Sequence, residues 1–311
     1  MINRPFPIPF IVGPTASGKS SLAVSLASEF PIEIISVDAR QVYIELNAGT
    51  AKPTANELSK VPHHLISERS AREPIDANAY ARWVYTKIDQ VLYRGRLPLL
   101  VGGSTLYSHA IEVGLSSLAD VAPSTVARLS QELADVGRDA LYSELERVDP
   151  EAARSMDATK TQRLIRALAY FRAHERPISI DRAIRVPPPF AFAMFLVSRD
   201  RDELYQRIDE RVPDMVAAGL VEEAHKLRAV GIDASQNPIR TIGYFEALQM
   251  MDNGKNEAWL IEQIQRNTRH YAKRQLTWFK ARTHYVPVHP ARATPLIDYV
   301  STCTSKVSTA L

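Results

Sequence analysis

Residues 13–20 of this chain, Gly-Pro-Thr-Ala-Ser-Gly-Lys-Ser, limit its possible folds more than any other segment. They match the pattern G-x-x-x-x-G-K-[ST], follow the apolar run 8–12 and precede the helical run 21–27. A strand, a glycine-rich loop and a helix in this order direct backbone amides and a helix N-terminus toward one anion. Lys19 adds a positive charge, and the Ser20 hydroxyl is a candidate ligand for Mg²⁺. The segment therefore predicts a site for a diphosphate or a triphosphate, and it leaves open which of the two binds.

Composition places the chain among soluble globular proteins, with 311 residues, 45% of them hydrophobic and 23% charged. This length suits one large domain or two unequal ones. Cys303 is the only cysteine, so no disulfide and no cysteine-based zinc site forms within one chain, which favours a reducing compartment. Prolines interrupt the apolar N-terminus, and no segment approaches the roughly eighteen uninterrupted apolar residues of a membrane span. We expect a cytoplasmic protein without a membrane segment.

The first third of the chain, residues 8–110, alternates short β-branched runs with segments of helical spacing. Such alternation predicts an α/β fold, in which a parallel sheet carries the phosphate-binding loop and is flanked by helices. Strands are expected at 8–12, 32–37 and 97–101, with a helix at 77–93. Ligands of such sheets collect at the carboxyl ends of the strands, so Asp38 and the pair Gly102-Gly103 are expected beside the phosphate loop.

The pattern changes near residue 115, where strand-like runs end and helical spacing takes over. A strand is expected again at 190–197, followed by helices. We therefore expect a phosphate-loop core in two parts, 1–114 and 188–311, with a helical insertion domain at 115–187 between them. The second part is basic, because residues 263–297 contain seven Lys and Arg and no Asp or Glu. This charge favours a polyanionic partner, and a solvated helix face is the alternative.

Asp38 and two arginines are the candidate charged groups of the site. A carboxylate at the end of the strand 32–37 is able to accept a proton from a nucleophile or to hold Mg²⁺, or it caps a turn. Arg201 and Arg207 lie six residues apart on an expected helix, and Arg211 follows one turn further. Near the phosphate loop, Arg201 and Arg207 are placed to bind a leaving diphosphate, and surface ion pairs with neighbouring acidic residues are the alternative.

Three runs interleave basic, uncharged polar and apolar side chains: 162–166 on the insertion, and 239–244 and 271–279 in the C-terminal part. Basic and aromatic side chains on separate segments are typical of surfaces that follow a nucleic-acid backbone and stack unpaired bases. Aromatic residues at helical spacing are more often core residues, so we expect Trp278 and Phe279 to face mostly inward and the basic residues to face outward.

Taken together, these motifs resemble those of the tRNA dimethylallyltransferases, also called tRNA isopentenyltransferases, over about residues 8–285. The similar segments are GPTASGKS at 13–20, SVDARQVY at 36–43, GTAKP at 49–53, PHHLI at 62–66, PLLVGGSTLY at 98–107, VDPEAA at 148–153, QRLIRAL at 162–168, IRTIGY at 239–244 and YAKRQLTWF at 271–279. The resemblance implies transfer of the dimethylallyl group of dimethylallyl diphosphate to N6 of adenosine 37 in tRNAs that read codons beginning with U. It also implies Mg²⁺ as cofactor, a leaving diphosphate rather than ATP in the loop, and recognition of the tRNA anticodon stem-loop. Nothing in the sequence demands a dimer, and we expect a monomer.

The resemblance implies roles for the matching residues. Asp38, Thr15 and Arg201 are the expected catalytic residues, with Asp38 as general base or as hydrogen-bond acceptor for the adenine N6. The expected diphosphate-binding residues are Gly13, Pro14, Thr15, Ala16, Ser17, Gly18, Lys19, Ser20, Arg201 and Arg207, with Ser20 as the Mg²⁺ ligand. The expected tRNA-binding residues are Asp38, Ala39, Arg40, Gln41, Ser104, Gln162, Arg163, Leu164, Ile165, Arg166, Ile239, Arg240, Thr241, Ile242, Gly243, Tyr244, Lys273 and Arg274.

Three segments depart from the family pattern without removing a residue essential to the reaction. Ala39 stands where the family usually has Ser, and Ala169 stands where an acidic residue is common. GGSTLY replaces GGTGLY, so Thr105 lacks the backbone freedom of the usual glycine.

The residues alone leave three other functions open. One is a prenyltransferase that acts on a free adenine nucleotide, another is a small-molecule kinase that uses ATP, and the third is a non-enzymatic RNA-binding protein gated by a nucleotide. The insertion and the basic C-terminal helix favour tRNA over a free nucleotide, because a mononucleotide needs no extended binding surface.

Overall fold

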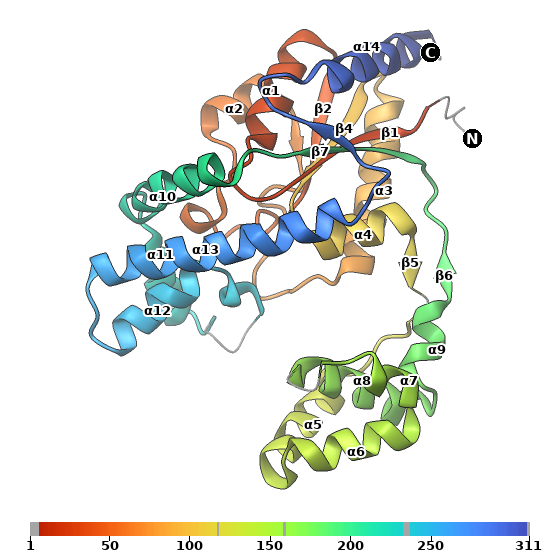
Figure 1. The fold of residues 1–311 in the computed structure, drawn as a ribbon, viewed down its shortest axis with the longest axis vertical. Coiled ribbons are helices and arrows are strands. Elements are labelled where there is room, and N and C mark those ends of the chain that lie inside the picture. The colour runs from red at the N-terminus through yellow and green to blue at the C-terminus, as the bar shows by residue number, and fades with distance from the viewer. Residues whose placement is uncertain (1–5, 117, 158–159, 233–236, 310–311) are drawn as a thin grey trace. The chain divides into compact units, whose positions relative to one another are not determined.

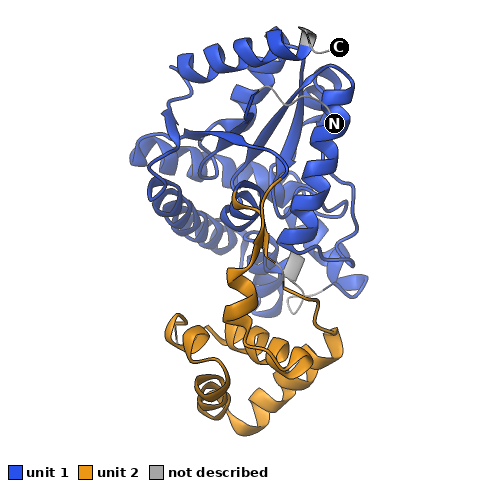
Figure 2. Cartoon of the chain, turned by 90° about the vertical axis from the view of Figure 1, so that its right-hand side faces the viewer, with its two compact units in different colours: residues 1–112, 189–311 blue, residues 113–188 orange. Residues whose placement is uncertain are grey.

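The computed structural model describes residues 6–116, 118–157, 160–232 and 237–309. The chain forms two compact units, which Figure 2 shows in different colours: a core unit of residues 1–112 and 189–311, and an insertion unit of residues 113–188. Each unit contains a hydrophobic core of its own. The sequence pattern alone places the corresponding boundaries after residues 114 and 187.

A six-stranded sheet forms the centre of the core unit, with strand order β3-β2-β4-β1-β7-β8 and parallel pairing throughout (Figure 1). Its strands are β1 (Ile8–Val12), β2 (Ile32–Val37), β3 (His63–His64), β4 (Leu97–Gly102), β7 (Phe192–Val197) and β8 (Val286–Val288). The sheet confirms the α/β fold and the four strands expected from the sequence. β3 and β8 were not expected, because two or three residues carry too little periodicity to predict a strand.

The register of the strands brings three loops to one edge of the sheet. Val12 at the end of β1 pairs with Gly102 at the end of β4, and Val37 at the end of β2 pairs with the same Gly102. The next residue of each chain segment therefore leaves the sheet at a common edge. This register places the phosphate loop, Asp38 and Gly103 beside one another, as the sequence predicts.

Helices cover the sheet, and β1, β2 and β4 are accordingly buried at every residue. The helices of the N-terminal part and of the C-terminus are α1 (Lys19–Glu29), α2 (Ala55–Lys60), α3 (Ala77–Tyr93), α4 (Thr105–Val113) and α14 (Thr294–Thr309), with the 3₁₀ turn η1 (Ala48–Thr50). α1 and α14 bury Leu26, Leu296 and Val300 in one cluster with the strands. α3 packs on β2 and β4, and its Tyr80 hydroxyl donates to the Ser36 carbonyl at 2.8 Å.

A group of C-terminal helices extends the core unit. It contains α10 (Arg201–Ala217), α11 (Leu220–Ala229), α12 (Tyr244–Asp252) and α13 (Glu257–Lys280), with the 3₁₀ turn η2 (Asn237–Arg240). α13 packs along α10 and α12 (Figure 1). An Arg269–Asp209 ion pair joins α13 to α10, and Gln265 Nε2 donates to the Asp209 carbonyl at 2.9 Å. Among the helices of the described residues, none combines the length and the hydropathy needed to cross a bilayer.

The insertion unit is a small helical body closed by a short antiparallel pair of strands. Its elements are β5 (Leu115–Ser116), α5 (Pro123–Val136), α6 (Arg138–Val148), α7 (Pro150–Arg154), α8 (Thr161–His174), α9 (Ile178–Ala183) and β6 (Arg185–Val186). Leu129, Leu145 and Leu168 meet in its core. Arg172 of α8 bridges Glu132 and Glu144, at 2.6 and 2.5 Å, and so ties α8 to α5 and α6.

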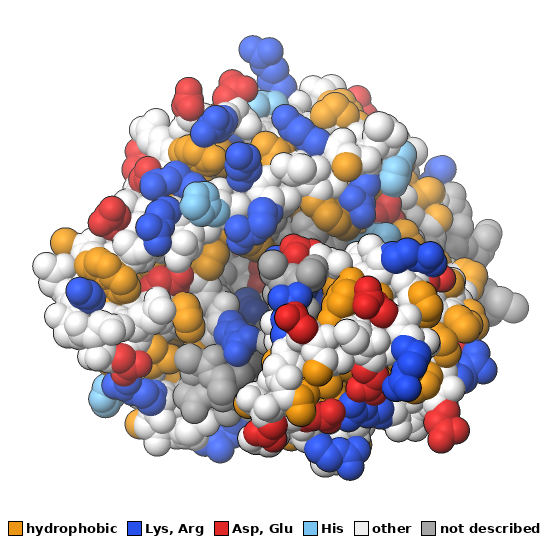
Figure 3. Space-filling view, turned by 60° about the horizontal axis from the view of Figure 1, so that its bottom comes forward, with side chains coloured by type: hydrophobic (Ala, Val, Ile, Leu, Met, Phe, Trp, Pro, Cys, Tyr) orange, Lys and Arg blue, Asp and Glu red, His pale blue; other side chains and the backbone are white. Residues whose placement is uncertain are grey.

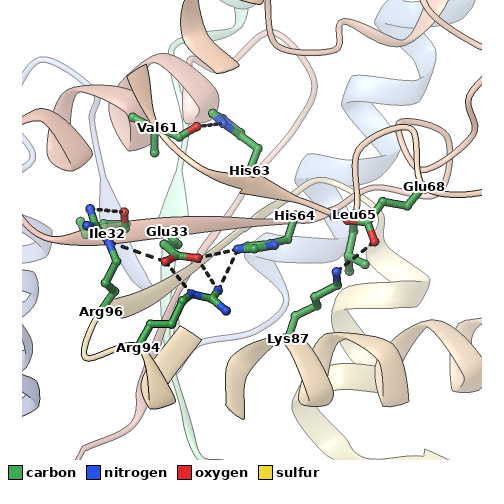
Figure 4. A network of polar contacts seen from close by, with 10 residues as sticks. All are labelled: Ile32, Glu33, Val61, His63, His64, Leu65, Glu68, Lys87, Arg94 and Arg96. Carbon is green, nitrogen blue, oxygen red and sulfur yellow. Dashed lines mark hydrogen bonds and ion pairs between the residues drawn. The ribbon is translucent and has the colours of Figure 1, made fainter. Parts of the chain in front are cut away.

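A buried carboxylate lies at the other end of β2 from Asp38 (Figure 4). Glu33 accepts hydrogen bonds from Arg94 Nε and Nη2 at 3.0 and 2.6 Å, and its Oε2 lies 2.7 Å from His64 Nε2. His63 instead directs its ring to the Val61 carbonyl, at 2.8 Å. The adjacent histidines therefore serve two separate partners at the amino-terminal edge of the sheet.

Candidate active site

The phosphate loop joins the end of β1 to α1, which begins at Lys19. Gly13 has a φ of +152°, and a Cβ at this position would lie 2.2 Å from the carbonyl oxygen of Val197 in β7. Only glycine fits there, because both the conformation and the space exclude a side chain. Gly18 has a φ of +94° and is the N-cap of α1, so the loop enters the helix through a residue in the left-handed region.

Four cationic side chains approach this loop. Arg207 Nε donates to the Ala16 carbonyl and Arg199 Nε to the Ser17 carbonyl, both at 2.9 Å. Arg211 Nη1 donates to the Thr15 hydroxyl at 3.3 Å. Lys19 Nζ donates to the Pro14 carbonyl at 2.6 Å. The loop is therefore approached by positive charge from Arg199, which lies between β7 and α10, from two arginines of α10 and from its own lysine.

Burial affects the pKa values of two of these cations, Lys19 and Arg211. It lowers the pKa of Lys19 to about 8, against the opposing effect of the Asp38 carboxylate and with a further lowering by Arg211. Burial also lowers the pKa of the Arg211 guanidinium, while Asp38 raises it. Cations that have lost their water are those that gain most from a bound anion.

A cavity of about 460 Å³ opens in front of the loop, and we call it the loop cavity. It is lined by Thr15, Ala16, Gly18, Lys19, Ser20, Ser21, Asp38, Gln41, Thr50, Ala51, Val101, Gly102, Gly103, Arg207, Glu210, Arg211, Asp214, Tyr271 and Gln275. Its walls come from the loop, the ends of β2 and β4, and helices α10 and α13, which matches the edge of the sheet where the sequence predicts a ligand.

A second cavity of about 390 Å³ adjoins it, and we call it the adjoining cavity. It is lined by Thr15, Asp38, Ala39, Arg40, Gly49, Thr50, Ser104, Ile208, Arg211, Val212, Met215, Arg240, Thr241, Ile242, Thr268, Tyr271 and Arg274. The residues common to both cavities are Thr15, Asp38, Thr50, Arg211 and Tyr271. A ligand at the phosphate loop and a second ligand in the adjoining cavity would therefore meet beside Asp38.

Asp38 is held in place by the turn that follows β2. Its Oδ1 accepts hydrogen bonds from the amides of Arg40 and Gln41 at 2.7 and 3.2 Å. The alternative role as a turn cap is thus realised, and it is compatible with a catalytic role because the same bonds fix the direction of the carboxylate. Gln41 lines the loop cavity, and its Nε2 donates to the carbonyls of Thr50 and Ala51 at 3.1 and 2.8 Å, so this side chain also holds the neighbouring loop.

Arg201 lies away from the position expected for it. It is the exposed first residue of α10, its guanidinium lies 5.1 Å from the Tyr205 ring centre, and it is absent from the described lining of both cavities. Helical geometry explains the difference. Arg207 and Arg211 are four residues apart and share a face, whereas Arg201 precedes Arg207 by six residues and points about 120° away from it around the helix axis. Arg211, which the sequence reading did not assign to the site, takes the place beside Thr15.

The run 239–244 divides between the cavity and the core. Arg240, Thr241 and Ile242 line the adjoining cavity. Ile239 and Tyr244 are fully buried, so their side chains do not face a ligand as expected. The Tyr244 hydroxyl accepts from the Gly49 amide at 3.1 Å and donates to a Glu223 carboxylate oxygen at 2.7 Å. Through the Gly49 amide, this tyrosine fixes the loop that carries Thr50.

The basic runs 162–166 and 271–279 each have a buried face and an exposed face. On α8, Gln162, Arg163 and Arg166 are exposed, while the expected contacts Leu164 and Ile165 are buried in the insertion core. On α13, Lys273 and Arg274 are exposed, and Phe279 is buried as expected. Trp278 is only half-buried and stacks with Arg282, whose guanidinium carbon lies 3.0 Å from the ring centre. Figure 3 shows Lys and Arg side chains gathered over part of one face.

Gln275 of α13 is a site residue that sequence reasoning missed. Its buried carboxamide contacts the phosphate loop and the Gly103 carbonyl. Within YAKRQLTWF it is an uncharged residue between basic and apolar neighbours, and nothing in the local pattern indicates that it reaches a loop at the other end of the chain.

Known proteins are similar to this chain in sequence and in fold. A family model described as IPP transferase matches residues 41–282. The chain is 43% identical over 295 residues to the tRNA dimethylallyltransferase of Salinibacter ruber, covering 94% of this chain and 91% of that protein. It is 40% identical over 279 residues to the tRNA dimethylallyltransferase of Chlorobium chlorochromatii, covering 88% of this chain and 90% of that protein.

Two solved structures resemble most of the chain. One is a full-length tRNA isopentenylpyrophosphate transferase from Bacillus halodurans, with a TM-score of 0.69 and 32% identity, covering 97% of this chain and 98% of that one. The other is a eukaryotic dimethylallyltransferase acting on tRNA, with a TM-score of 0.75 and 23% identity, covering 91% of this chain and 73% of that one; it supports the fold alone. Since the family model matches more than half of its residues, the chain belongs to the IPP transferase family.

Proposed function

We propose that this protein transfers the dimethylallyl group of dimethylallyl diphosphate to N6 of adenosine 37 in tRNAs that read codons beginning with U. The observation that carries the proposal is the meeting of the two cavities at Asp38: one cavity has the phosphate loop as its wall, and the other is lined by basic and polar residues of separate segments. The names of the relatives and the family membership agree with it.

In the proposed reaction the bond between C1 of the dimethylallyl group and the diphosphate oxygen breaks, and a bond forms between C1 and adenine N6. The diphosphate leaves with the electron pair, and Lys19, Arg207 and Arg211 stabilise the charge that develops on it. The carbon fragment is a delocalised allylic cation, which must be shielded from water. The half-buried Tyr271, at the boundary of both cavities, contributes an apolar ring to this shielding.

Asp38 receives the proton that N6 loses. An exocyclic adenine amine is a weak nucleophile, so its orientation beside a carboxylate is a large part of the catalysis. The base enters the adjoining cavity only after it leaves the stack of the anticodon loop, as other enzymes that modify bases require. Ser104 and Thr241 are hydroxyls of this cavity that are placed to orient the base.

The donors present suit Mg²⁺ held partly by the substrate. Ser20 and Asp38 present oxygen atoms in the loop cavity, and the described residues include no group of three or more His, Cys, Asp or Glu arranged to hold a metal. Mg²⁺ prefers such oxygen ligands, keeps several waters and uses phosphate oxygens of a substrate. We assign Ser20 as its protein ligand; a bound Mg²⁺ would add positive charge next to the diphosphate.

The exposed basic residues are assigned to the tRNA backbone around the anticodon stem-loop. They are Arg163 and Arg166 on the insertion unit and Arg240, Lys273 and Arg274 on the core unit. We infer that the protein acts as a monomer in the cytoplasm.

Mass spectrometry of tRNA nucleosides tests the proposal. Unmodified tRNA, incubated with the protein, Mg²⁺ and dimethylallyl diphosphate, is expected to gain one dimethylallyl group at adenosine 37. AMP and labelled ATP serve as competing substrates, and neither is expected to gain a prenyl group or to lose a phosphate to a small molecule. Prenylated AMP with unmodified tRNA, or phosphate transfer without prenylation, would contradict the proposal.

A further inference from the structure

The carboxamide of Gln275 links the phosphate loop to the end of a neighbouring strand. Gln275 is 3% exposed. Its Oε1 accepts a hydrogen bond from the Thr15 amide at 2.9 Å, and its Nε2 donates to the Gly103 carbonyl at 2.7 Å. Both polar ends of one buried side chain are thus satisfied by the two segments that leave β1 and β4.

The surroundings allow this side chain little freedom. A Cβ on Gly103 would lie 2.9 Å from Gln275 Nε2, 3.0 Å from the Gly13 carbonyl oxygen and 3.6 Å from Lys19 Nζ. The carboxamide, the start of the loop and the loop lysine therefore converge on the Gly103 backbone. Gln275 also lines the loop cavity, so it contacts the phosphate loop and lies near the proposed anion site.

Thr15 is held from two sides by this arrangement. Its amide is bonded to Gln275, and its hydroxyl accepts from Arg211 at 3.3 Å. The Ser17 amide is bonded within the loop, to the Pro14 carbonyl at 3.4 Å. A loop whose shape is fixed before the anion arrives loses less conformational freedom on binding than a loop that must fold around it.

We propose that Gln275 is a positioning residue for the diphosphate, which orients Thr15 and so keeps the phosphate loop in its binding shape. It acts through Thr15 and does not itself react. The inference rests on the proposed function of the loop cavity. A positioning role and a packing role of Gln275 make different predictions. If Gln275 only packed α13 against the sheet, its replacement would not change the affinity of the folded protein for an anion.

The test compares two glutamines of the same helix. Gln275→Met keeps the length of the side chain and removes both hydrogen bonds, whereas the control Gln265→Met removes one bond to the Asp209 carbonyl of α10, remote from the loop. Inorganic diphosphate with Mg²⁺ is titrated into each folded protein by calorimetry, and KM for dimethylallyl diphosphate is measured. We expect Gln275→Met to weaken diphosphate binding about 10- to 100-fold and to raise KM in parallel, with tRNA affinity unchanged. Gln265→Met is expected to match the wild-type protein.

A second variant keeps the test decisive if Gln275→Met does not fold. Gln275→Glu retains an acceptor for the Thr15 amide, loses the donor to Gly103 and adds a negative charge near Lys19. We expect it to bind diphosphate more weakly than the wild type and to move the alkaline limb of kcat/KM to higher pH. Wild-type affinity in both Gln275 variants, or an equal loss in Gln265→Met, would overturn the inference. A wild-type protein that binds no diphosphate and modifies no tRNA would instead overturn the proposed function.

Discussion

At Lys19, burial and two neighbouring charges act on one ammonium group. Burial lowers its pKa to about 8, Asp38 opposes this effect and Arg211 adds to it. The sequence predicts that Lys19 faces a phosphate, since the loop pattern fixes its position. It does not predict the pKa shift, because Arg211 and the wall formed by α13 come from distant parts of the chain.

The pH dependence of the reaction follows from this shift. Lys19 is charged below about pH 8 and loses its proton above it, so kcat/KM for dimethylallyl diphosphate is expected to fall above pH 8. In the substrate complex the bound anion favours the charged form, so kcat should remain constant to higher pH. Steady-state kinetics from pH 6 to about 10 check both curves, with Lys19→Arg as a variant that does not titrate in this range. A kcat/KM that is level up to pH 10 would show that this lysine does not carry the binding.

The same group contributes to stability with a defined sign. Its pKa is lower in the folded state than the ordinary value of 10.5, so the cost of burying the charged form is present in full below pH 8. The cost decreases as the pH rises from 8 toward 10.5, because the unfolded state then binds more protons than the folded one.

Arg211 and Arg201 allow a direct comparison of the structure with the sequence reading. Arg211→Gln is expected to lower kcat/KM by about 10²- to 10³-fold, because it removes a half-buried cation that donates to Thr15 and lines the loop cavity where the proposed leaving group binds. Arg201→Gln is expected to change it less than about threefold, because this side chain is exposed outside both cavities. Kinetics with dimethylallyl diphosphate and tRNA measure both variants. The reverse order of effects would favour Arg201 as the diphosphate-binding residue that the sequence predicts.

Among the elements, the strands with continuous apolar runs were predictable and the short edge strands were not. β1, β2 and β4 have runs of five or six buried residues that the sequence displays plainly. β8 is Val-Pro-Val, with two of its three residues exposed, and β3 is a pair of histidines. The role of Tyr244 was equally hidden, since a tyrosine after basic residues has the composition of an RNA contact while its partners Gly49 and Glu223 lie far away in sequence.

Glu33 provides a test of how the amino-terminal edge of the sheet is stabilised. Burial alone raises the pKa of Glu33, but hydrogen bonds from Arg94 and His64 outweigh it and hold the pKa below its usual value. This stabilisation is therefore present above the normal carboxylate pKa and is lost as the pH falls through the depressed value. Glu33→Gln is expected to lower the free energy of unfolding by about 1–3 kcal/mol at pH 7, measured by urea denaturation.

The matched control for this prediction is an exposed ion pair. Glu73 is 68% exposed and lies 3.7 Å from Arg69, so Glu73→Gln should change the free energy of unfolding by less than about 0.5 kcal/mol. Diphosphate affinity should be unchanged in both variants, because Glu33 lies at the opposite end of β2 from Asp38. A similar loss of stability in both variants would show that the Glu33 network adds nothing beyond a surface pair.

At the scale of the whole molecule, the chain combines an α/β core unit with a helical insertion unit that has its own core. The sequence anticipated this division because strand-like runs stop near 115 and return at 190. It did not separate the inner from the outer residues of QRLIR: Leu164 and Ile165 are buried, and the basic residues around them are exposed. The spacing of apolar and polar residues shows that a helix has two different faces. The element that packs against the apolar face is known only from the fold.

The exposed arginines of the insertion unit are expected to bind tRNA through its phosphates. Arg163→Ala combined with Arg166→Ala should weaken tRNA binding and reduce the slope of log K against log salt by about one to two, because each phosphate contact releases counterions. Binding titrations between roughly 50 and 200 mM salt measure this slope. Arg147→Ala, an exposed arginine on α6 of the same unit, is the control and should leave the slope unchanged. Equal slopes for all three proteins would remove these residues from the RNA surface.

The central claim is that one site holds a diphosphate at the phosphate loop and brings the carbon to be transferred next to Asp38. A crystal structure with a non-hydrolysable dimethylallyl diphosphate analogue tests it most directly. We predict that the phosphates contact the amides of residues 16–20 with Lys19 and Arg211 beside them, and that C1 points to Asp38 at the boundary of the two cavities. An analogue whose phosphates lie outside the loop cavity, or whose C1 points away from Asp38, would contradict the account.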